Sequence, residues 1–168
     1  MSELALELES ADSQRQARYD ELLERLQAIL QDESDWITAM ATVVCELHHS
    51  FAYYHWTGFY RVVAPELLKI GPYQGGHGCL VIPFARGVCG AAARTATTQL
   101  VDNVHEANDH IACSSTTNSE IVVPVMHPEK GLMAVLDVDS DHFAAFRQVD
   151  QEGLEKICRY LGQKRFQF

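Results

Sequence analysis

The possible fold is restricted most by the hydrophobic pattern of the chain. Both ends show helical periodicity, and the stretch between them consists of short segments in which apolar and polar residues alternate. From Gln16 to Leu30 apolar residues recur at three- and four-residue spacing, and a second stripe runs from Asp35 to His48 with Ser34 as its expected N-cap. A third stripe, from Asp150 to Leu161, closes the chain. Each stripe needs a surface on which to bury its apolar side, and the middle of the chain has to supply it.

That middle stretch shows the period-two alternation of strands. Strands are predicted over 55–63, 67–70, 79–83, 121–126 and 132–138. Gly71–Gly78 and the polar stretch 98–118 are expected to be irregular, and a short alanine-rich helix is expected to begin at Gly87. The order predicts an α+β domain, in which a central antiparallel sheet carries the terminal helices on one face and the active-site loops on the other.

The length and net charge of the chain limit its domain organisation and the kinds of partner it can bind. Residues 1–14 are acidic and weakly periodic, which predicts a mobile tail or a frayed helix start before a single domain over 15–168. The net charge of −10 disfavours nucleic acid and anionic membrane surfaces as partners. No apolar run is long enough for a membrane span, and the first residues lack the basic start of a secretory signal.

The chain has five cysteines, an odd number, which together with the missing export signal predicts a reducing, cytoplasmic location with free thiols. Cys45 and Cys158 lie beside or on helical stripes and are expected to pack in the core. Cys79, Cys89 and Cys113 instead lie in glycine-rich or polar segments, which suggests chemistry. The alternative is that these three are also small buried hydrophobic residues, as free cysteine often is.

Three acidic residues follow the cysteines and complete a candidate redox site. Asp137 and Asp139 are two residues apart on one predicted strand and so share a face, and Glu120 lies on the neighbouring strand. Crowding of like charges raises carboxyl pKa values, so one acid could stay protonated and deliver a proton after a thiolate attacks. Cys89 falls at the first turn of a predicted helix, a position that favours a thiolate. The alternative for the acids is a solvated rim at the sheet edge.

Seven segments occur in order along the chain: WTGFY, GPYQG, the cysteine of GGHGC, RGVCG, HIAC, NSEIVVP and VLDVDS. With them, the chain from Trp56 to Ser140 closely resembles the free methionine-(R)-sulfoxide reductases, a catalytic branch of the GAF-domain superfamily. Four places depart from the family pattern, among them Ala85, where glycine is common, and the turn 127–131, which is one residue longer than in some relatives. Gly75–Gly78 replaces a lysine-containing stretch, and Asn108-Asp109 stands where proline-glycine is frequent.

The resemblance implies a role for each matching residue. Cys113 matches the nucleophile, and Cys79 and Cys89 match two resolving cysteines, with Cys79 the usual disulfide partner. The residues implied to bind substrate are the acids that hold the sulfoxide and amino groups and the aromatic wall around the methyl group: Glu120, Asp137, Asp139, Trp56 and Tyr60. From the residues alone, Trp56 and Tyr60 could equally be core aromatics.

The implied reaction reduces free L-methionine-(R)-S-oxide through a sulfenic acid and an intramolecular disulfide, which thioredoxin then reduces. It needs no metal, flavin or nucleotide cofactor, and the family's frequent homodimers make a dimer a candidate assembly.

Three alternatives remain beside this hypothesis. One is a GAF sensor that binds a small molecule or responds to redox state without catalysis. Another is a zinc site built from the three cysteines and some histidines, which the absence of closely spaced cysteine pairs disfavours. The third is a phosphate cradle at Gly71–Gly78, which lacks the spacing of the known phosphate-binding loops.

Overall fold

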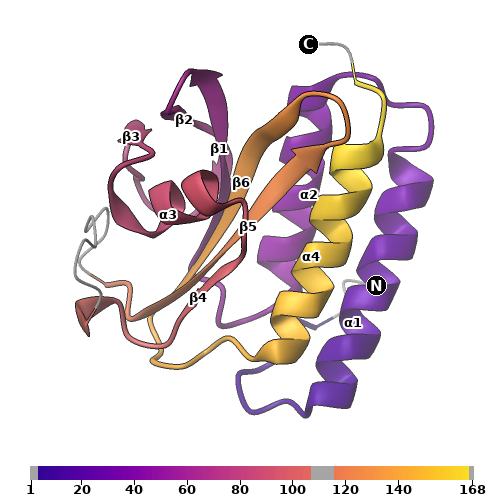
Figure 1. Cartoon of the computed structure of the whole chain (residues 1–168). Coiled ribbons are helices and arrows are strands. Elements are labelled where there is room, and N and C mark those ends of the chain that lie inside the picture. Colours follow the sequence, from indigo (N-terminus) through magenta and orange to yellow (C-terminus); the bar gives the residue numbers. More distant parts are fainter. Residues whose placement is uncertain (1–3, 107–115, 167–168) are drawn as a thin grey trace.

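A computed structural model describes residues 4–106 and 116–166, and a curled antiparallel sheet with helices on both faces forms its centre (Figure 1). The helices are α1 (Asp12–Ile29), α2 (Trp36–Ser50), α3 (Gly87–Thr95) and α4 (Gln148–Gln163), with a short 3₁₀ helix at Val104–Glu106. The strands are β1 (Trp56–Ala64), β2 (Leu67–Gln74), β3 (Val81–Pro83), β4 (Gln99–Val101), β5 (Ser119–His127) and β6 (Gly131–Ser140). Their order across the described sheet is β3-β2-β1-β6-β5-β4.

The two faces of the sheet are covered differently. The three long helices lie on one side of the sheet, where α2 and α4 contact the strands and α1 packs against α4 and α2, whereas the short α3 lies on the other side (Figure 1). The larger apolar core lies between the long helices and the sheet, and a smaller one lies beneath α3. This arrangement confirms the predicted α+β fold. None of the helices in the described part of the chain combines the length and apolar character that crossing a membrane requires.

Two helix starts differ from the prediction by a few residues. The N-cap of α2 is Asp35, whose carboxylate accepts a hydrogen bond from the Thr38 backbone N–H at 2.6 Å. Ser34 was the wrong cap because α2 begins at Trp36, one residue later than predicted, and the capping residue directly precedes the first helical residue. The first helix starts at Asp12 rather than at Gln16.

The described residues of the predicted tail lie against the rest of the protein. Leu6 forms a parallel bridge with Phe51. The Leu8 carbonyl accepts hydrogen bonds from the guanidinium groups of Arg15 and Arg147. Leu6 and Leu8 therefore contact the rest of the domain, and α1 begins at Asp12, inside the segment predicted as a tail or a helix start.

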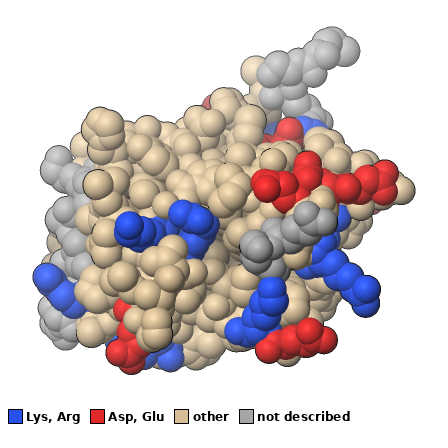
Figure 2. Space-filling model, turned by 90° about the horizontal axis from the view of Figure 1, so that it is seen from above, with Lys and Arg blue, Asp and Glu red and all other residues tan. Residues whose placement is uncertain are grey.

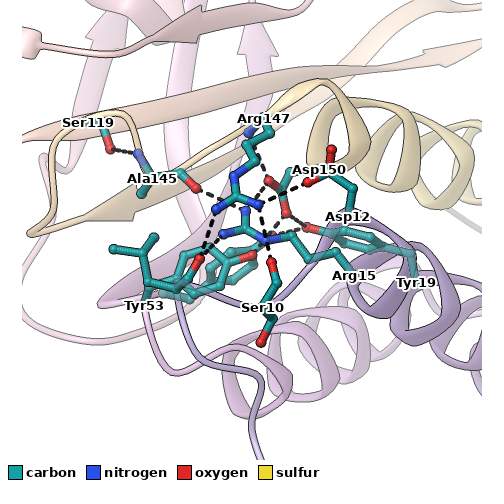
Figure 3. Close-up of polar contacts among 11 residues, drawn as sticks. Ser10, Asp12, Arg15, Tyr19, Tyr53, Ser119, Ala145, Arg147 and Asp150 are labelled. Atoms are coloured by element: carbon teal, nitrogen blue, oxygen red, sulfur yellow. Dashed lines mark hydrogen bonds and ion pairs between the residues drawn. The ribbon is translucent and has the colours of Figure 1, made fainter.

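A buried ion pair joins the first and last helices. Arg15 and Asp150 are both fully buried, and the Arg15 guanidinium donates a hydrogen bond to the Asp150 carboxylate (Figure 3). Asp150 also accepts from the Tyr19 and Tyr53 hydroxyl groups, each at 2.9 Å. Arg15 donates further to the Ala145 carbonyl at 3.0 Å. The pair thus ties α1 to the start of α4 and to the loop before it.

The second strand is longer than predicted. β2 runs to Gln74, so the expectation that regular structure stops at Gly71 was wrong for its first four residues. The register with β1 shifts so that Gly71 and Pro72 together oppose Phe59. This is a β-bulge, where a proline without an N–H group is tolerated because it breaks no ladder hydrogen bond.

The remaining differences concern short elements and one cysteine. The three-residue β4 and the 3₁₀ helix lie inside the stretch 98–118 that was expected to be irregular. β3 begins at Val81, two residues later than predicted. Cys158 is buried as predicted, but Cys45 is exposed and its thiol lies near the His49 ring, so the core prediction for Cys45 was wrong.

Candidate active site

Strands β5 and β6 bring the three predicted acidic residues together. Glu120 on β5 lies directly opposite Asp139 on β6, and Asp137 lies two residues before Asp139 on the same face. One oxygen of each carboxyl group lies within 4.8 Å of the others. Glu120 and Asp137 are each only 6% exposed, and both strands are interior to the sheet. The predicted cluster is confirmed, and the alternative of a solvated rim at the sheet edge is wrong.

Burial makes these acids hold protons near neutral pH. It raises the pKa of Glu120 to about 8, with the negative charge of Asp137 as the second cause. It likewise raises the pKa of Asp137 to about 7. Burial and the charges of Asp137 and Glu120 raise the pKa of Asp139 well above its ordinary value, and a side-chain hydrogen bond joins Asp139 to Glu120. The cluster can therefore both donate a proton and carry a negative charge at pH 7.

Cys89 lies against this acidic cluster from the α3 side. It is the third residue of α3, it is buried, and its Sγ donates to Asp137 Oδ2 at 3.3 Å. Burial raises the pKa of the Cys89 thiol well above its ordinary value, and the charges of Asp137 and Glu120 raise it further. The expectation that the helix start favours a thiolate was wrong here, because burial and the nearby carboxyl groups outweigh the N-terminal N–H groups.

Strand β1 contributes an aromatic surface beside the acids. Trp56 and Tyr60 are both buried, and their rings stack with centroids 5.8 Å apart. Trp56 lies opposite Asp139 across the β1–β6 pair. Gly58, between the two aromatics, leaves the space into which the Trp56 ring folds, since an added Cβ would lie 2.5 Å from that ring. The two residues thus belong to the smaller apolar core beneath α3, beside the acidic cluster.

The loop before β3 covers this aromatic pair and carries Cys79. The Trp56 indole N–H donates to the Gly76 carbonyl at 3.0 Å. An added Cβ at Gly78 would come within 3.0 Å of both the Trp56 ring and the Tyr60 hydroxyl. The backbone N–H of Cys79 bonds to that hydroxyl. Glycine at position 78 therefore lets the loop bring Cys79 down onto the site.

The cysteines of the site differ in redox state. Cys79 is disulfide-bonded. The three free cysteines among the described residues are Cys45, Cys89 and Cys158. Cys113, the predicted nucleophile, lies outside the described residues.

Three features of the site were missed in the sequence. Tyr73 on β2 stacks on Trp56 with centroids 5.5 Å apart, and only the bulge brings it there. The Thr117 hydroxyl bonds to Asp139. Asp137 Oδ1 is buried and has no hydrogen-bond partner among the described residues, which leaves it available as an acceptor. Three acidic oxygens this close could share one positive group, either an ammonium or a metal ion.

Known proteins share the sequence and the fold of this chain. The GAF domain family matches residues 14–164. A free methionine-R-sulfoxide reductase of Escherichia coli is 34% identical over 143 residues, covering 85% of this chain and 86% of that protein. One from Saccharomyces cerevisiae is 35% identical over 154 residues, covering 86% of each. The structure of free methionine-R-sulfoxide reductase from Neisseria meningitidis with its substrate has a TM-score of 0.84 at 37% identity, covering 96% of this chain and 94% of that one.

Proposed function

Since the chain belongs to the GAF-domain family, in the branch of the free methionine-(R)-sulfoxide reductases, we propose that it is an oxidoreductase that reduces free L-methionine-(R)-S-oxide to L-methionine. The observation that carries this proposal is the buried, partly protonated cluster of Glu120, Asp137 and Asp139 beside the Trp56–Tyr60 surface. A free amino acid sulfoxide presents an ammonium group, a polar S=O group and a methyl group, and the site offers a counterpart for each.

The acids serve the two polar ends of the substrate. The unpartnered Asp137 Oδ1 is an acceptor for the substrate ammonium group, whose positive charge favours ionisation of that carboxyl. Asp139 and Glu120 share a hydrogen bond, and the proton they retain is available to the sulfoxide oxygen. Trp56 and Tyr60 provide an apolar surface for the methyl group.

The proposed chemistry uses Cys113 as the nucleophile. Its thiolate attacks the sulfoxide sulfur while an acid of the cluster protonates the oxygen. The oxygen passes to Cys113 as a sulfenic acid, and methionine leaves with the sulfoxide sulfur reduced by two electrons. The Cys79 thiol then attacks the sulfenic sulfur, which forms a disulfide and releases water. The disulfide bonding of Cys79 supports its role as the main resolving cysteine.

Cys89 has a different place in this scheme. Its raised pKa and its bond to Asp137 make it a neutral thiol that stabilises that carboxylate. We propose it as the secondary resolving cysteine. Thioredoxin or a similar dithiol is the proposed reductant, in the cytoplasm, and a homodimer is the proposed assembly.

The decisive experiment measures methionine release from each methionine sulfoxide epimer with dithiothreitol as reductant. We expect turnover of the R epimer alone, its loss in Cys113→Ser, and a decrease of about 10²-fold or more in Glu120→Gln. Cys45→Ser, which changes an exposed thiol away from the site, is the matched control and should keep full activity. Equal turnover by Cys113→Ser and the unmodified protein would overturn the mechanism. Binding of the sulfoxide without turnover would instead favour the sensor alternative.

A further inference from the structure

The segment that directly follows Cys79 exposes apolar side chains at the edge of the sheet. Leu80 is 71% exposed and Val81 is 46% exposed, whereas the next residue, Ile82, is buried. β3 is the edge strand of the described sheet and pairs on one side, with β2. Exposed edge strands are usually protected by charged residues because they invite pairing with other chains. β3 has the short length and the proline, Pro83, that protect many edge strands, but Leu80 and Val81 remain exposed and apolar next to a cysteine that changes its bonding in the proposed reaction.

The backbone at the same place is free to pair. The Leu80 carbonyl accepts from the Ile70 N–H at 3.1 Å, and the Phe84 N–H donates to the Glu66 carbonyl at 2.9 Å. Alternate residues of an antiparallel strand bond the same neighbour, so the N–H and C=O groups of Val81 point away from β2. An extended segment of another protein can therefore add to this edge through main-chain hydrogen bonds.

The surroundings of this edge are basic although the protein as a whole is acidic. Between residues 56 and 98 there are four basic side chains and one acidic side chain, against a net charge of −10 for the chain. They are Arg61, Lys69, Arg86, Arg94 and Glu66. Lys69 lies opposite Val81 across the β2–β3 pair, and Arg61 lies opposite Lys69 on β1; Figure 2 shows basic side chains together with some acidic ones on this side of the molecule. A partner for this region should carry acidic groups around an apolar contact.

From these observations we infer that Leu80 and Val81 form the docking site of a protein dithiol reductant, an oxidoreductase with a reactive cysteine pair and an acidic rim. The inference rests on the proposed function, which requires an outside reductant. A thiolate of the reductant attacks Cys79 Sγ, forming a mixed disulfide and releasing the partner sulfur of Cys79 as a thiolate. The second thiol of the reductant then attacks its own sulfur in the mixed disulfide and frees Cys79. Two electrons and two protons pass from the reductant to the protein.

The position and the charge of the docking site favour a dithiol reductant over a second copy of the chain. The reductant has to approach within bonding distance of Cys79, and Leu80 and Val81 are the exposed apolar residues next to it in the chain. A second copy would also present the same basic surface to this one, which repels.

The test compares a protein reductant with a small one. Turnover of methionine-(R)-sulfoxide is measured with thioredoxin, thioredoxin reductase and NADPH, and in parallel with dithiothreitol, for Leu80→Ser and for Ile29→Ser. Ile29 is a matched exposed aliphatic residue, on α1. We expect Leu80→Ser to raise the KM for thioredoxin about tenfold, as loss of a central apolar contact does, while its turnover with dithiothreitol stays unchanged. Ile29→Ser should match the unmodified protein with both reductants.

The possible outcomes separate the docking inference from the proposed function. An unchanged KM for thioredoxin in Leu80→Ser overturns the docking site, as does an equal loss of turnover with dithiothreitol, which would place Leu80 in the site itself. No turnover of the unmodified protein with dithiothreitol overturns the proposed function instead. A thioredoxin with its second cysteine changed to serine traps the mixed disulfide, and peptide mapping should find it on Cys79. Trapping on Cys89 would overturn the proposed attack.

Discussion

Replacing Asp137 with asparagine tests whether burial of the acidic cluster is what keeps it protonated. Asparagine has the same shape as aspartic acid, and its carbonyl oxygen can still accept from the Cys89 thiol, now 3.3 Å from Asp137 Oδ2. The substitution removes a group that is neutral at low pH and charged at high pH. It also removes the charge that raises the pKa of Glu120, so that pKa should fall below about 8.

The size of the effect follows from the pKa of Asp137. A pKa of about 7 in the folded protein, against an ordinary value of about 3.9, corresponds to a free energy of about 4 kcal/mol. Because the pKa is raised on folding, the folded state holds a proton that the unfolded state has lost. The stabilising contribution is therefore complete below about pH 4 and is lost as the pH rises through about 7. The asparagine side chain would have no such dependence, since it does not titrate.

The assay is urea denaturation at a series of pH values from 4 to 8, with the cysteines in one redox state throughout. We expect the free energy of unfolding of Asp137→Asn, relative to the unmodified protein, to rise by about 4 kcal/mol across this range. Asp32→Asn, which removes an exposed carboxylate, is the control and should follow the unmodified protein. Parallel curves for Asp137→Asn and the unmodified protein would refute the argument that the cluster is protonated because it is buried.

Two further predictions concern other buried groups. Arg15→Met leaves the buried Asp150 carboxylate without its cation, so the free energy of unfolding measured in urea should fall by about 3–5 kcal/mol. Replacing Asp150 with leucine in the same variant should recover part of this loss. If Arg15→Met is as stable as the unmodified protein, the ion pair contributes nothing to stability. Cys89 is buried and its pKa is raised, so iodoacetamide at pH 7.5 should alkylate it much more slowly than the exposed Cys45. Peptide mass spectrometry measures the two alkylation rates. Equal rates would contradict the assignment of Cys89 as a neutral, buried thiol.

The sequence carried enough local signal for most of the fold. The stripe of α2 repeats at helical spacing, and most of its apolar members lie in the core, so the periodicity alone predicted its buried side. The same holds for Asp137 and Asp139, whose spacing of two put them on one face of a strand. Predictions of this kind succeed because they depend only on the geometry of a single helix or strand.

Features set by pairing between segments could not be predicted in this way. The bulge at Gly71 and Pro72 exists only in register with β1, so the sequence of β2 alone indicated a break. The thiol state of Cys89 depends on α3 lying over the carboxyl groups of two distant strands. The rule that a helix start lowers the pKa of a thiol predicted the opposite direction for Cys89, because it takes account of neither the burial nor the nearby carboxyl groups.

The two buried acidic centres of this protein show how the fold decides what a carboxyl group does. Asp150, in the helical layer, is held by the guanidinium of Arg15, so its charge is satisfied within the protein (Figure 3). Among the ion pairs of the described residues, none involves Glu120, Asp137 or Asp139. A buried carboxyl group that has no cation is neutral or needs one from outside. Protons fill that role in the cluster, and in the proposed reaction a substrate ammonium group replaces one of them while another moves to the sulfoxide oxygen. The lack of an internal cation is thus what leaves these acids available to the substrate in the proposed function.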